Sequence, residues 1–317
     1  MRVHPANPRD LRDILRLSLA TGQHSPAELE MQVTVFMQYA RSVGLALNEH
    51  WWCDGDHRRT ACTCVTSPGR TAMLMFPSSI ASGLRQSELA DFIAAVVEAK
   101  KSSDLCLLQC LTLPEDMNLA TALLRAGFRE IAILQYLDAD LDNPVTIDWI
   151  QSVLSKQLES TTALTYEPAM RGALAELIAA TYEGSLDCPS LTNLRALDDV
   201  IEGHQAAGRF DERRWLILSD AAGLIGCILM NENPLRPVLE VVYMGVHPRA
   251  RRGGVGKWLL AAALELAHRE GITKVTLAVD ERNDPARRLY SAAGFRETMR
   301  RRALIRVLSA SSAPLES

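Results

Sequence analysis

The spacing of apolar residues predicts a strand, a helix and a second strand in the C-terminal third of the chain. Residues 238–246 form an apolar run rich in β-branched residues, which is typical of a strand. From Val255 to Ala267 apolar residues recur at helical spacing, and Gly271 follows where a left-handed C-terminal cap is expected. Residues 274–279 alternate between apolar and other positions, which again predicts a strand.

A second helix is expected after this strand. Asp284 has a side chain suited to an N-cap, and Pro285 suits the first helical position. Gly294 is placed to end the helix. The predicted order is therefore strand, loop, helix, strand, helix.

The loop between the first strand and the first helix combines glycines with cations. Glycines let backbone N–H groups come close to a polyanion, and the following helix points the positive end of its dipole at the same place. Cationic side chains add donors around that position. The glycines are Gly253, Gly254 and Gly256, and the cations are Arg251, Arg252 and Lys257. The loop is therefore predicted to hold phosphate groups.

Two common phosphate-binding patterns do not fit this loop. The Walker pattern needs a Gly-Lys-Ser/Thr ending, and the dinucleotide fingerprint needs Gly-x-Gly-x-x-Gly with an acidic residue about twenty positions later. Residues 251–256 instead read Arg-x-x-Gly-x-Gly, which resembles the acyl-CoA signature of the GNAT N-acetyltransferases. From Asn283 to Phe295 the chain reads Asn-x-x-Ala-x-x-Leu-Tyr-x-x-x-Gly-Phe, which is similar to that family's second signature. The resemblance covers roughly residues 163–308.

The resemblance implies a fold and a cofactor. The implied fold is α/β (α+β), with a mixed, mostly antiparallel sheet flanked by helices and a pair of parallel strands that splay apart at the acyl-CoA site. Acetyl-CoA is the implied co-substrate. Met244 and Val246 would pair with the pantetheine arm through their backbone, and Asn283 would hydrogen-bond the pantetheine region. The pyrophosphate would be held by the backbone of Arg251, Arg252, Gly253, Gly254, Val255, Gly256 and Lys257.

The resemblance also suggests two catalytic residues. Tyr290 stands at the position of the family's usual general acid, and Glu240 at a position from which several members place a general base. A phenol can donate a proton to a thiolate leaving group, and a carboxylate can take one from an ammonium acceptor. Two other interpretations stay open: Tyr290 is a packing residue, and Glu240 is a solvated strand-end residue. Tyr243, on the same strand, is a second candidate for the acceptor pocket.

The acceptor is expected at residues 182–189 and 198–204, which follow the first helix of the domain. The carboxylates of these segments suit a cationic amine, although a solvated helix-loop-helix explains them equally well. Peptide N-termini and glycosylated thiol precursors both remain open as acceptors. Cys188, in the first segment, is expected to be a small buried thiol.

The chain is predicted to contain the same plan twice. The motif that ends at Phe128 matches the one that ends at Phe295 at an offset of 167. Four further matches, at an offset of 163, pair Pro5, Leu11, Trp52 and Cys64 with Pro168, Leu174, Trp215 and Cys227. Two tandem GNAT-type domains are therefore expected. The expected divisions are a degenerate domain at 1–140, a linker at 141–162 with a short helix, a catalytic domain at 163–310 and a C-terminal tail at 311–317.

The N-terminal copy is expected to be inactive. Leu123 stands where the tyrosine would be and Asp116 where the asparagine would be, and residues 77–86 keep one glycine and one arginine. Leucine cannot donate a proton, and a carboxylate facing CoA phosphates repels them. This copy would brace the active domain, complete the acceptor pocket or bind another ligand.

Composition narrows the remaining classes. A hydrophobic content of 48% and a charged content of 23% are typical of a globular chain. Because the sequence has no signal-peptide core and no apolar run long enough for a membrane span, a cytoplasmic location is expected. Residues 249–302 carry 13 basic and 6 acidic side chains, an excess that suits CoA phosphates. Aromatic content of 5% argues against a nucleic-acid partner, and seven cysteines without clustered histidines argue against a metal.

Together these features predict an acetyl-CoA-dependent N-acetyltransferase. The acetyl group would pass to a primary amine of a small molecule or peptide by direct attack in a ternary complex. The alternatives are a non-catalytic acyl-CoA-binding sensor and a partner-binding protein. The presence of Tyr290 favours the enzyme, and the sequence predicts no oligomeric state.

Overall fold

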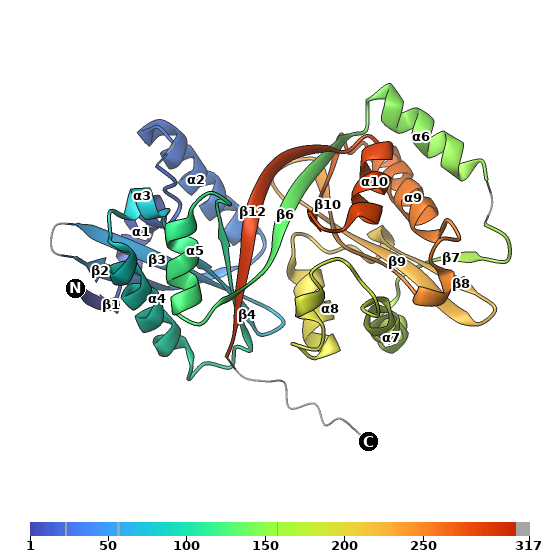
Figure 1. Ribbon diagram of the computed structural model, residues 1–317. Coiled ribbons are helices and arrows are strands. Elements are labelled where there is room, and N and C mark those ends of the chain that lie inside the picture. Colours follow the sequence, from blue (N-terminus) through green and yellow to red (C-terminus); the bar gives the residue numbers. More distant parts are fainter. Residues whose placement is uncertain (23, 56–57, 157, 309–317) are drawn as a thin grey trace, which may run out of the picture. The chain divides into compact units, whose positions relative to one another are not determined.

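The chain folds into two compact units. The structure is a computed structural model that describes residues 1–22, 24–55, 58–156 and 158–308 (Figure 1). Unit 1 comprises Met1–Ile133, Asn193–Ala196 and the chain from Arg301 onward, and unit 2 comprises Leu134–Thr192 and Leu197–Arg300. Within the described ranges, no helix has the length and apolar character that a membrane crossing requires.

Unit 2 is built on a mixed sheet. Its strands follow the order β6-β11-β10-β9-β8-β7, and their pairing is antiparallel except between β10 and β11, which run parallel. The bounds are β6 Arg129–Asp140, β7 Thr162–Thr165, β8 Trp215–Asp220, β9 Gly223–Glu232, β10 Val238–Val246 and β11 Lys274–Asp280. The strands predicted at 238–246 and 274–279 are therefore confirmed.

The two parallel strands separate part of the way along their length. Their register begins at Val238 and Lys274 and ends at Val241 and Leu277, although β10 runs on to Val246. A register shift between Val241 and Tyr243 on the β9 side marks a bulge in β10. Such a bulge bends its strand, so the second half of β10 is aimed away from β11. This separation is the splayed pair that the resemblance implies.

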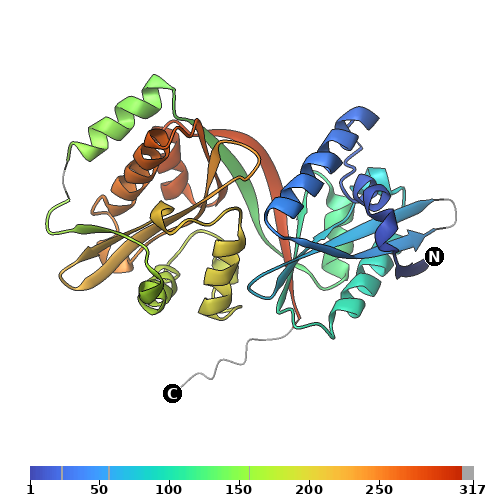
Figure 2. The same cartoon turned by 180° about the vertical axis from the view of Figure 1, so that it is seen from behind.

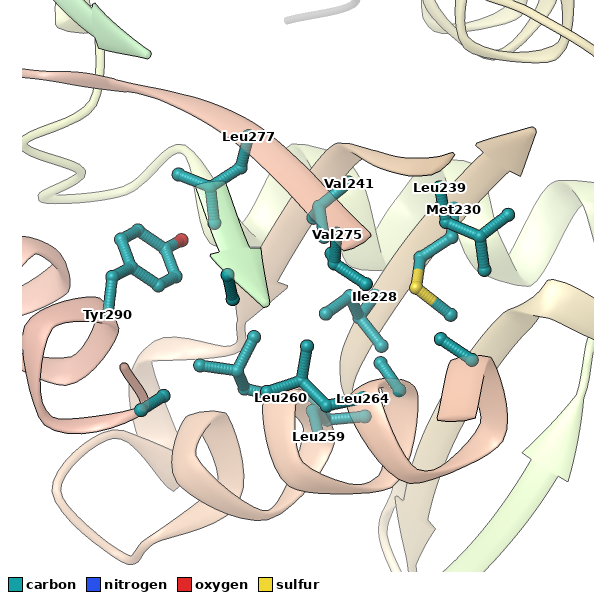
Figure 3. Close-up of a cluster of buried hydrophobic side chains, with 14 of the residues drawn as sticks. Ile228, Met230, Leu239, Val241, Leu259, Leu260, Leu264, Val275, Leu277 and Tyr290 are labelled. Atoms are coloured by element: carbon teal, nitrogen blue, oxygen red, sulfur yellow. The ribbon is translucent and has the colours of Figure 1, made fainter. Parts of the chain in front are cut away.

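Helices cover both faces of the unit 2 sheet (Figures 1 and 2). One face carries α6, α9 and α10, and the opposite face carries α7 and α8, which pack around the fully buried Trp215. On the first face, Leu259, Leu260 and Leu264 of α9 enter the buried cluster drawn in Figure 3. The bounds are α6 Pro144–Leu154, α7 Arg171–Thr181, α8 Leu197–Ala206, α9 Val255–Arg269 and α10 Asp284–Ala292.

The segment 141–162, predicted to be a linker, contributes to the core of unit 2. Its helix α6 buries Ile150 and Val153, and Ile150 belongs to the same cluster as the apolar face of α9. The apolar spacing of a helix that packs on a domain is the same as that of an amphipathic helix between domains, so the sequence alone does not separate these cases.

Unit 1 repeats this plan. Its sheet follows the order β1-β2-β3-β4-β5-β12, and β4 and β5 form its parallel pair. Helices α4 and α5 pack on one face around Phe92 and Leu123, and α1 packs on the other face with Ile14 against Trp52. The strands are β1 Arg2–Pro5, β2 Ala46–Asp54, β3 Arg59–Ser67, β4 Thr71–Met75, β5 Leu107–Thr112 and β12 Arg296–Val307. The helices are α1 Leu11–Ser18, α2 Pro26–Ser42, α3 Ser79–Ser82, α4 Gln86–Lys100 and α5 Met117–Arg125.

Each unit completes its sheet with residues from a strand that begins in the other unit. In unit 1, residues 302–307 of β12 pair antiparallel with β5, and in unit 2, residues 134–140 of β6 pair antiparallel with β11. The boundaries expected at 140 and 163 therefore do not coincide with the limits of the compact units. Pairing between strands that are far apart in the sequence leaves no local pattern. The predicted boundaries therefore assigned each strand to the domain of its neighbours in the sequence.

The repeat holds at an offset of 167 for α5 and α10 and for β6 and β12. It differs near the start of each copy, because the equivalent elements β1 and β7, and likewise α1 and α7, are offset by 160. The pair Pro5 and Pro168, expected at an offset of 163, is therefore wrong: Pro5 ends β1, whereas Pro168 opens a 3₁₀ turn. The short 3₁₀ turns are η1 Pro8–Asp10, η2 Pro168–Met170, η3 Pro189–Leu191, η4 Glu212–Arg214 and η5 Pro248–Ala250.

The helix ends follow the sequence closely, with one correction. Gly271 and Gly294 adopt the predicted left-handed conformation, with φ of +72° and +90°. The N-cap of α10 is Asn283 and not Asp284, because the Asn283 side chain accepts the N–H of Ala286 at 3.3 Å. Both residue types cap helices well, so the sequence did not distinguish between these neighbours.

Candidate active site

A cavity of about 680 Å³ lies in unit 2, where β10 and β11 separate. Its walls come from the end of α7 and the turn after it, from β10, from the glycine-rich loop (residues 251–257) and from α10. Most of the predicted site residues line it: Met244, Val246, Arg251, Arg252, Gly254, Val255, Gly256, Lys257, Asn283 and Tyr290. Gly253 and Glu240 are not part of this lining.

The glycine-rich loop has a conformation that depends on its glycines. Gly254 is the N-cap of α9 and has φ of +84°, in the left-handed region that favours glycine. Arg252 is also left-handed, with φ of +66°. A Cβ atom at Gly256 would lie 3.3 Å from Cε of Met244, so a side chain there would fill the space between loop and strand. The first turn of α9 therefore presents its backbone N–H groups directly at the cavity.

The Arg251 side chain holds the loop in place. Its Nε donates to the carbonyl of Val246 at 3.1 Å, and its Nη2 donates to the carbonyl of Thr181 at 2.8 Å. These bonds join the glycine-rich loop to the end of β10 and to the C-terminus of α7. The sequence predicted Arg251 as a phosphate-binding position, and it gave no signal for the Thr181 contact, which spans 70 residues.

Lys257 lies on the other side of the loop, facing α6. Its Nζ is 5.9 Å from the ring centroid of Trp149, within the range of a cation–π contact. Trp149 comes from the segment expected to be a linker and was not predicted to approach the site. Its presence fixes the direction of the Lys257 side chain beside the loop.

At the residues the resemblance selects, β10 has run past its pairing with β11, although the Val246 carbonyl already accepts from Arg251. Met244 and Val246 pair with Ile228 and Gly226 on the β9 side, whereas the register with β11 has already ended at Val241. Both residues line the cavity. An extended ligand can therefore add to this edge as a strand would.

Tyr290 stands between the buried core and the cavity. Its side chain is 8% exposed and its ring lies 5.7 Å from that of Phe295, yet it also lines the cavity. The hydroxyl contacts Sδ of Met244 at 3.9 Å, and Figure 3 shows it pointing away from α10, toward Leu277. Burial raises the pKa of Tyr290 above its ordinary value, so the phenol keeps its proton at neutral pH. Packing and proton donation are thus compatible in this residue.

Glu240 lies deeper along β10, beside Thr276 of β11 and Asn231 of β9. Glu240 is an exposed residue, yet desolvation by the surrounding protein raises the pKa of its carboxyl. A carboxylate with a raised pKa is a better proton acceptor near neutral pH. Its catalytic role stays a prediction, because it does not line the cavity that holds Tyr290.

Tyr243 occupies the opposite face of β10, toward α7 and α8. Its hydroxyl hydrogen-bonds the hydroxyl of Thr181, and its ring lies 5.1 Å from that of His204. Burial raises the pKa of Tyr243 well above its ordinary value. A buried phenol therefore lies on each side of β10: its own Tyr243 faces α7 and α8, and Tyr290 of α10 contacts Met244 on the other side.

The turn after α7 is fastened to the end of β11 by a reciprocal pair of hydrogen bonds. The carboxylate of Asp187 accepts the N–H of Asp280 at 2.9 Å, and the carboxylate of Asp280 accepts the N–H of Cys188 at 3.3 Å. Asn283 also donates to Asp187. Burial raises the pKa of the Cys188 thiol to about 12, which makes it an unreactive cysteine. The sequence selected this turn, 182–189, but not the role of Asp187 within it.

The counterpart of this site in unit 1 is closed by its own carboxylate. Asp116 accepts the N–H of Ser79 at 2.7 Å and the N–H of Leu119 at 3.1 Å. Ser79 begins α3, which stands where unit 2 has its glycine-rich loop. A cavity of about 490 Å³ remains beside Asp116, but this carboxylate already accepts the Ser79 amide at the start of α3. Among the described side chains of both units, no group of three or more His, Cys, Asp or Glu could hold a metal ion.

Comparison with known proteins places these features in one family. The Acetyltransferase (GNAT) family model matches residues 177–295. A mycothiol acetyltransferase of Salinispora arenicola is 41% identical over 91 residues, which cover 27% of this chain and 30% of that protein. A mycothiol acetyltransferase of Streptomyces bingchenggensis is 29% identical over 169 residues, covering 53% of this chain and 51% of that protein. The matches thus span from about a third to a half of the length of these relatives.

Solved structures agree over nearly the whole chain. A GCN5-related N-acetyltransferase from Sphaerobacter thermophilus has a TM-score of 0.63 at 16% identity, covering 97% of this chain and 95% of that one. A tandem GNAT protein from the clavulanic acid biosynthesis pathway has a TM-score of 0.55 at 17% identity, covering 98% of this chain and 99% of that one. At such identities the likeness concerns the fold, and it includes the tandem arrangement of the two domains.

Proposed function

Because the chain belongs to the GNAT acetyltransferase family, we propose that it transfers the acetyl group of acetyl-CoA to a primary amine, with the chemistry confined to unit 2. The observation that carries the proposal is the arrangement of one cavity. The glycine-rich loop stands at one end, the open backbone of β10 forms a side, and Tyr290 reaches in from α10. These are the positions that a phosphate, a pantetheine arm and a departing thiolate require.

Direct attack in a ternary complex suits this geometry. The acceptor nitrogen adds to the thioester carbonyl carbon, the C–S bond breaks, and Tyr290 protonates the sulfur. Met244 contacts the Tyr290 hydroxyl, so the donor strand and the acid are already adjacent. Glu240 is the proposed base for the acceptor, acting directly or through water, since its carboxyl has a raised pKa.

The acceptor is proposed to be a small-molecule or peptide amine. Several relatives are named mycothiol acetyltransferase, so a mycothiol-related amine is one candidate in a panel of amines to be tested as acceptors. The decisive assay measures thiol release from acetyl-CoA with such a panel. Amine-dependent release supports the enzyme, whereas acetyl-CoA binding without release from any amine favours the non-catalytic sensor.

Acetyl-CoA is expected to bind once per chain. In unit 1 the Asp116 carboxylate already accepts the loop amide of Ser79, and its negative charge repels a phosphate. Gly256→Leu should weaken acetyl-CoA binding on the order of tenfold or more by filling the gap beside Met244. Calorimetry measures both the stoichiometry and the affinity.

The matched control is Gly172→Leu on α7, where a Cβ atom meets no other atom within 4 Å. This variant should keep the wild-type affinity. Two equivalent sites per chain, or equal affinities in the two leucine variants, would contradict the assignment of the cofactor to this loop.

Glu240→Gln is expected to lower kcat by roughly 10²-fold at neutral pH, the usual scale for losing a general base. The loss should shrink as the pH rises, because the acceptor amine then loses its proton to solvent. In the wild type, the raised pKa of Glu240 means that the basic form is present above that pKa and is lost as the pH falls through it. Glu212→Gln, an exposed position outside the cavity, is the control. If the loss of kcat in Glu240→Gln does not depend on pH, Glu240 is not the base that takes the proton of the acceptor.

A further inference from the structure

The charges that line the cavity are separated by sign. Of the charged side chains in its described lining, the three cations Arg251, Arg252 and Lys257 all belong to the glycine-rich loop. The single anion is Asp187, which comes from the turn after α7. A polyanion is favoured at the loop, and a cation is favoured beside Asp187.

The Asp187 carboxylate is held in position by backbone and amide donors. It accepts the N–H of Asp280 at 2.9 Å and a further hydrogen bond from Asn283. The neighbouring carboxylate of Asp280 is paired with Arg282 at 2.6 Å. The ion pairs formed by described residues do not include Asp187, whose side chain is exposed toward the cavity. Its negative charge is therefore fixed in space and available to a ligand.

Asp187 and Tyr290 line the same cavity. The charge of Asp187 acts on Tyr290 and contributes to the raised pKa of that phenol. If Tyr290 protonates the departing sulfur, the attacking nitrogen must stand one carbonyl carbon away from that sulfur. An amine that attacks beside Tyr290 therefore enters the cavity that Asp187 also lines.

We propose that Asp187 binds the ammonium group of the acceptor and thereby selects cationic amines over neutral molecules of the same shape. This inference rests on the proposed acetyl transfer. Desolvation and the nearby charge of Asp280 raise the pKa of Asp187, so an ammonium ion stabilises a carboxylate that its surroundings otherwise penalise. The acceptor binds as a cation at Asp187 and gives up its proton before attack, a step that falls to Glu240.

Two carboxylates with separate tasks give separable kinetics. Removing the charge of Asp187 weakens ammonium binding, which raises KM for the amine. Removing the base at Glu240 lowers kcat. The comparison between Asp187→Asn and Glu240→Gln therefore distinguishes binding from proton transfer.

The experiment uses the full chain and two pairs of probes. Glucosamine and glycinamide are the amines, and glucose and glycolamide are their hydroxyl counterparts, assayed as inhibitors. Asparagine at position 187 keeps an oxygen that can accept the N–H of Asp280, so the turn stays fastened. We expect Asp187→Asn to raise KM for the amine roughly 10- to 100-fold, the range of one charge-assisted hydrogen bond. The acetyl-CoA affinity, kcat at saturating amine and inhibition by the hydroxyl counterparts should change less than about twofold.

Glu176→Gln is the matched control, since it also removes one negative charge, at an exposed position of α7 outside the cavity lining. An unchanged KM in Asp187→Asn, with wild-type turnover established, overturns the inference and leaves the acetyl transfer standing. Equal weakening of amines and hydroxyl counterparts also overturns it, because that result indicates a structural role. A wild-type chain that binds acetyl-CoA but acetylates no amine contradicts the proposed function itself, and the Asp187 inference with it.

Discussion

Tyr290→Phe is expected to lower kcat by roughly 10²-fold or more while the affinity for acetyl-CoA stays nearly constant. The ring of Tyr290 packs against Phe295 and the core of unit 2, and phenylalanine preserves that packing. Only the hydroxyl is lost, and with it the contact to Met244. Steady-state kinetics and calorimetry on the same preparation separate the two effects.

The pH dependence tests the same assignment from another side. An acid must carry its proton to act, and burial raises the pKa of Tyr290 above its ordinary value of about 10. Activity should therefore persist at alkaline pH and decline only above that value. Tyr166→Phe is the control, because Tyr166 is also a buried tyrosine of unit 2 but does not line the cavity. If Tyr290→Phe has the turnover of the wild type, Tyr290 is not the general acid and its role is structural.

The sequence predicted those parts of the site that depend on neighbouring residues. Gly271 and Gly294 were placed correctly because a left-handed residue at a helix end has a strong local preference. The two motifs around Gly254 and Tyr290 were placed for the same reason, since each forms within one loop or one helix. Their meeting in one cavity follows from the separation of β10 and β11, which the family resemblance supplied.

Other parts of the site arise from contacts between distant segments. The Arg251 guanidinium binds the carbonyl of Thr181, and Asp187 binds the backbone of Asp280, at separations of 70 and 93 residues. Nearly every residue has a backbone carbonyl and an N–H group, so the residue type does not indicate which backbone group a side chain will bind. The sequence could identify Asp187 only as one of several acidic residues in a segment, and the geometry distinguished it.

The crossing of strands between the units is the largest feature without a local signal. Residues 134–140 of β6 complete the sheet of unit 2, although they belong to the sequence copy that forms unit 1. Leu137 and Ala139 enter the same buried cluster as Leu277 of β11. A boundary drawn from the repeat, near residue 140 or 150, therefore removes part of the core of unit 2.

A fragment of residues 150–317 is accordingly expected to fail as an independent domain. It lacks the β6 strand that pairs with β11, together with the buried side chains of Leu137 and Leu141. Loss of one buried leucine side chain costs about 2–5 kcal/mol, and the whole stability of a domain is about 5–15 kcal/mol. Without β6, the edge of β11 would also have unpaired backbone groups, which favour aggregation.

The matched fragment spans residues 134–300, which comprise all of unit 2 together with the connecting residues 193–196, which belong to unit 1. We expect this fragment to be soluble and to bind acetyl-CoA, whereas 150–317 should be insoluble or should unfold at least about 10 °C lower, since 1 kcal/mol shifts the midpoint of a domain of this size by about 2–4 °C. Soluble yield, the thermal midpoint and the acetyl-CoA dissociation constant are measured for both fragments and the full chain. Equal midpoints and affinities for the two fragments would show that β6 adds nothing to unit 2, and that the sheet of the catalytic unit is complete without it.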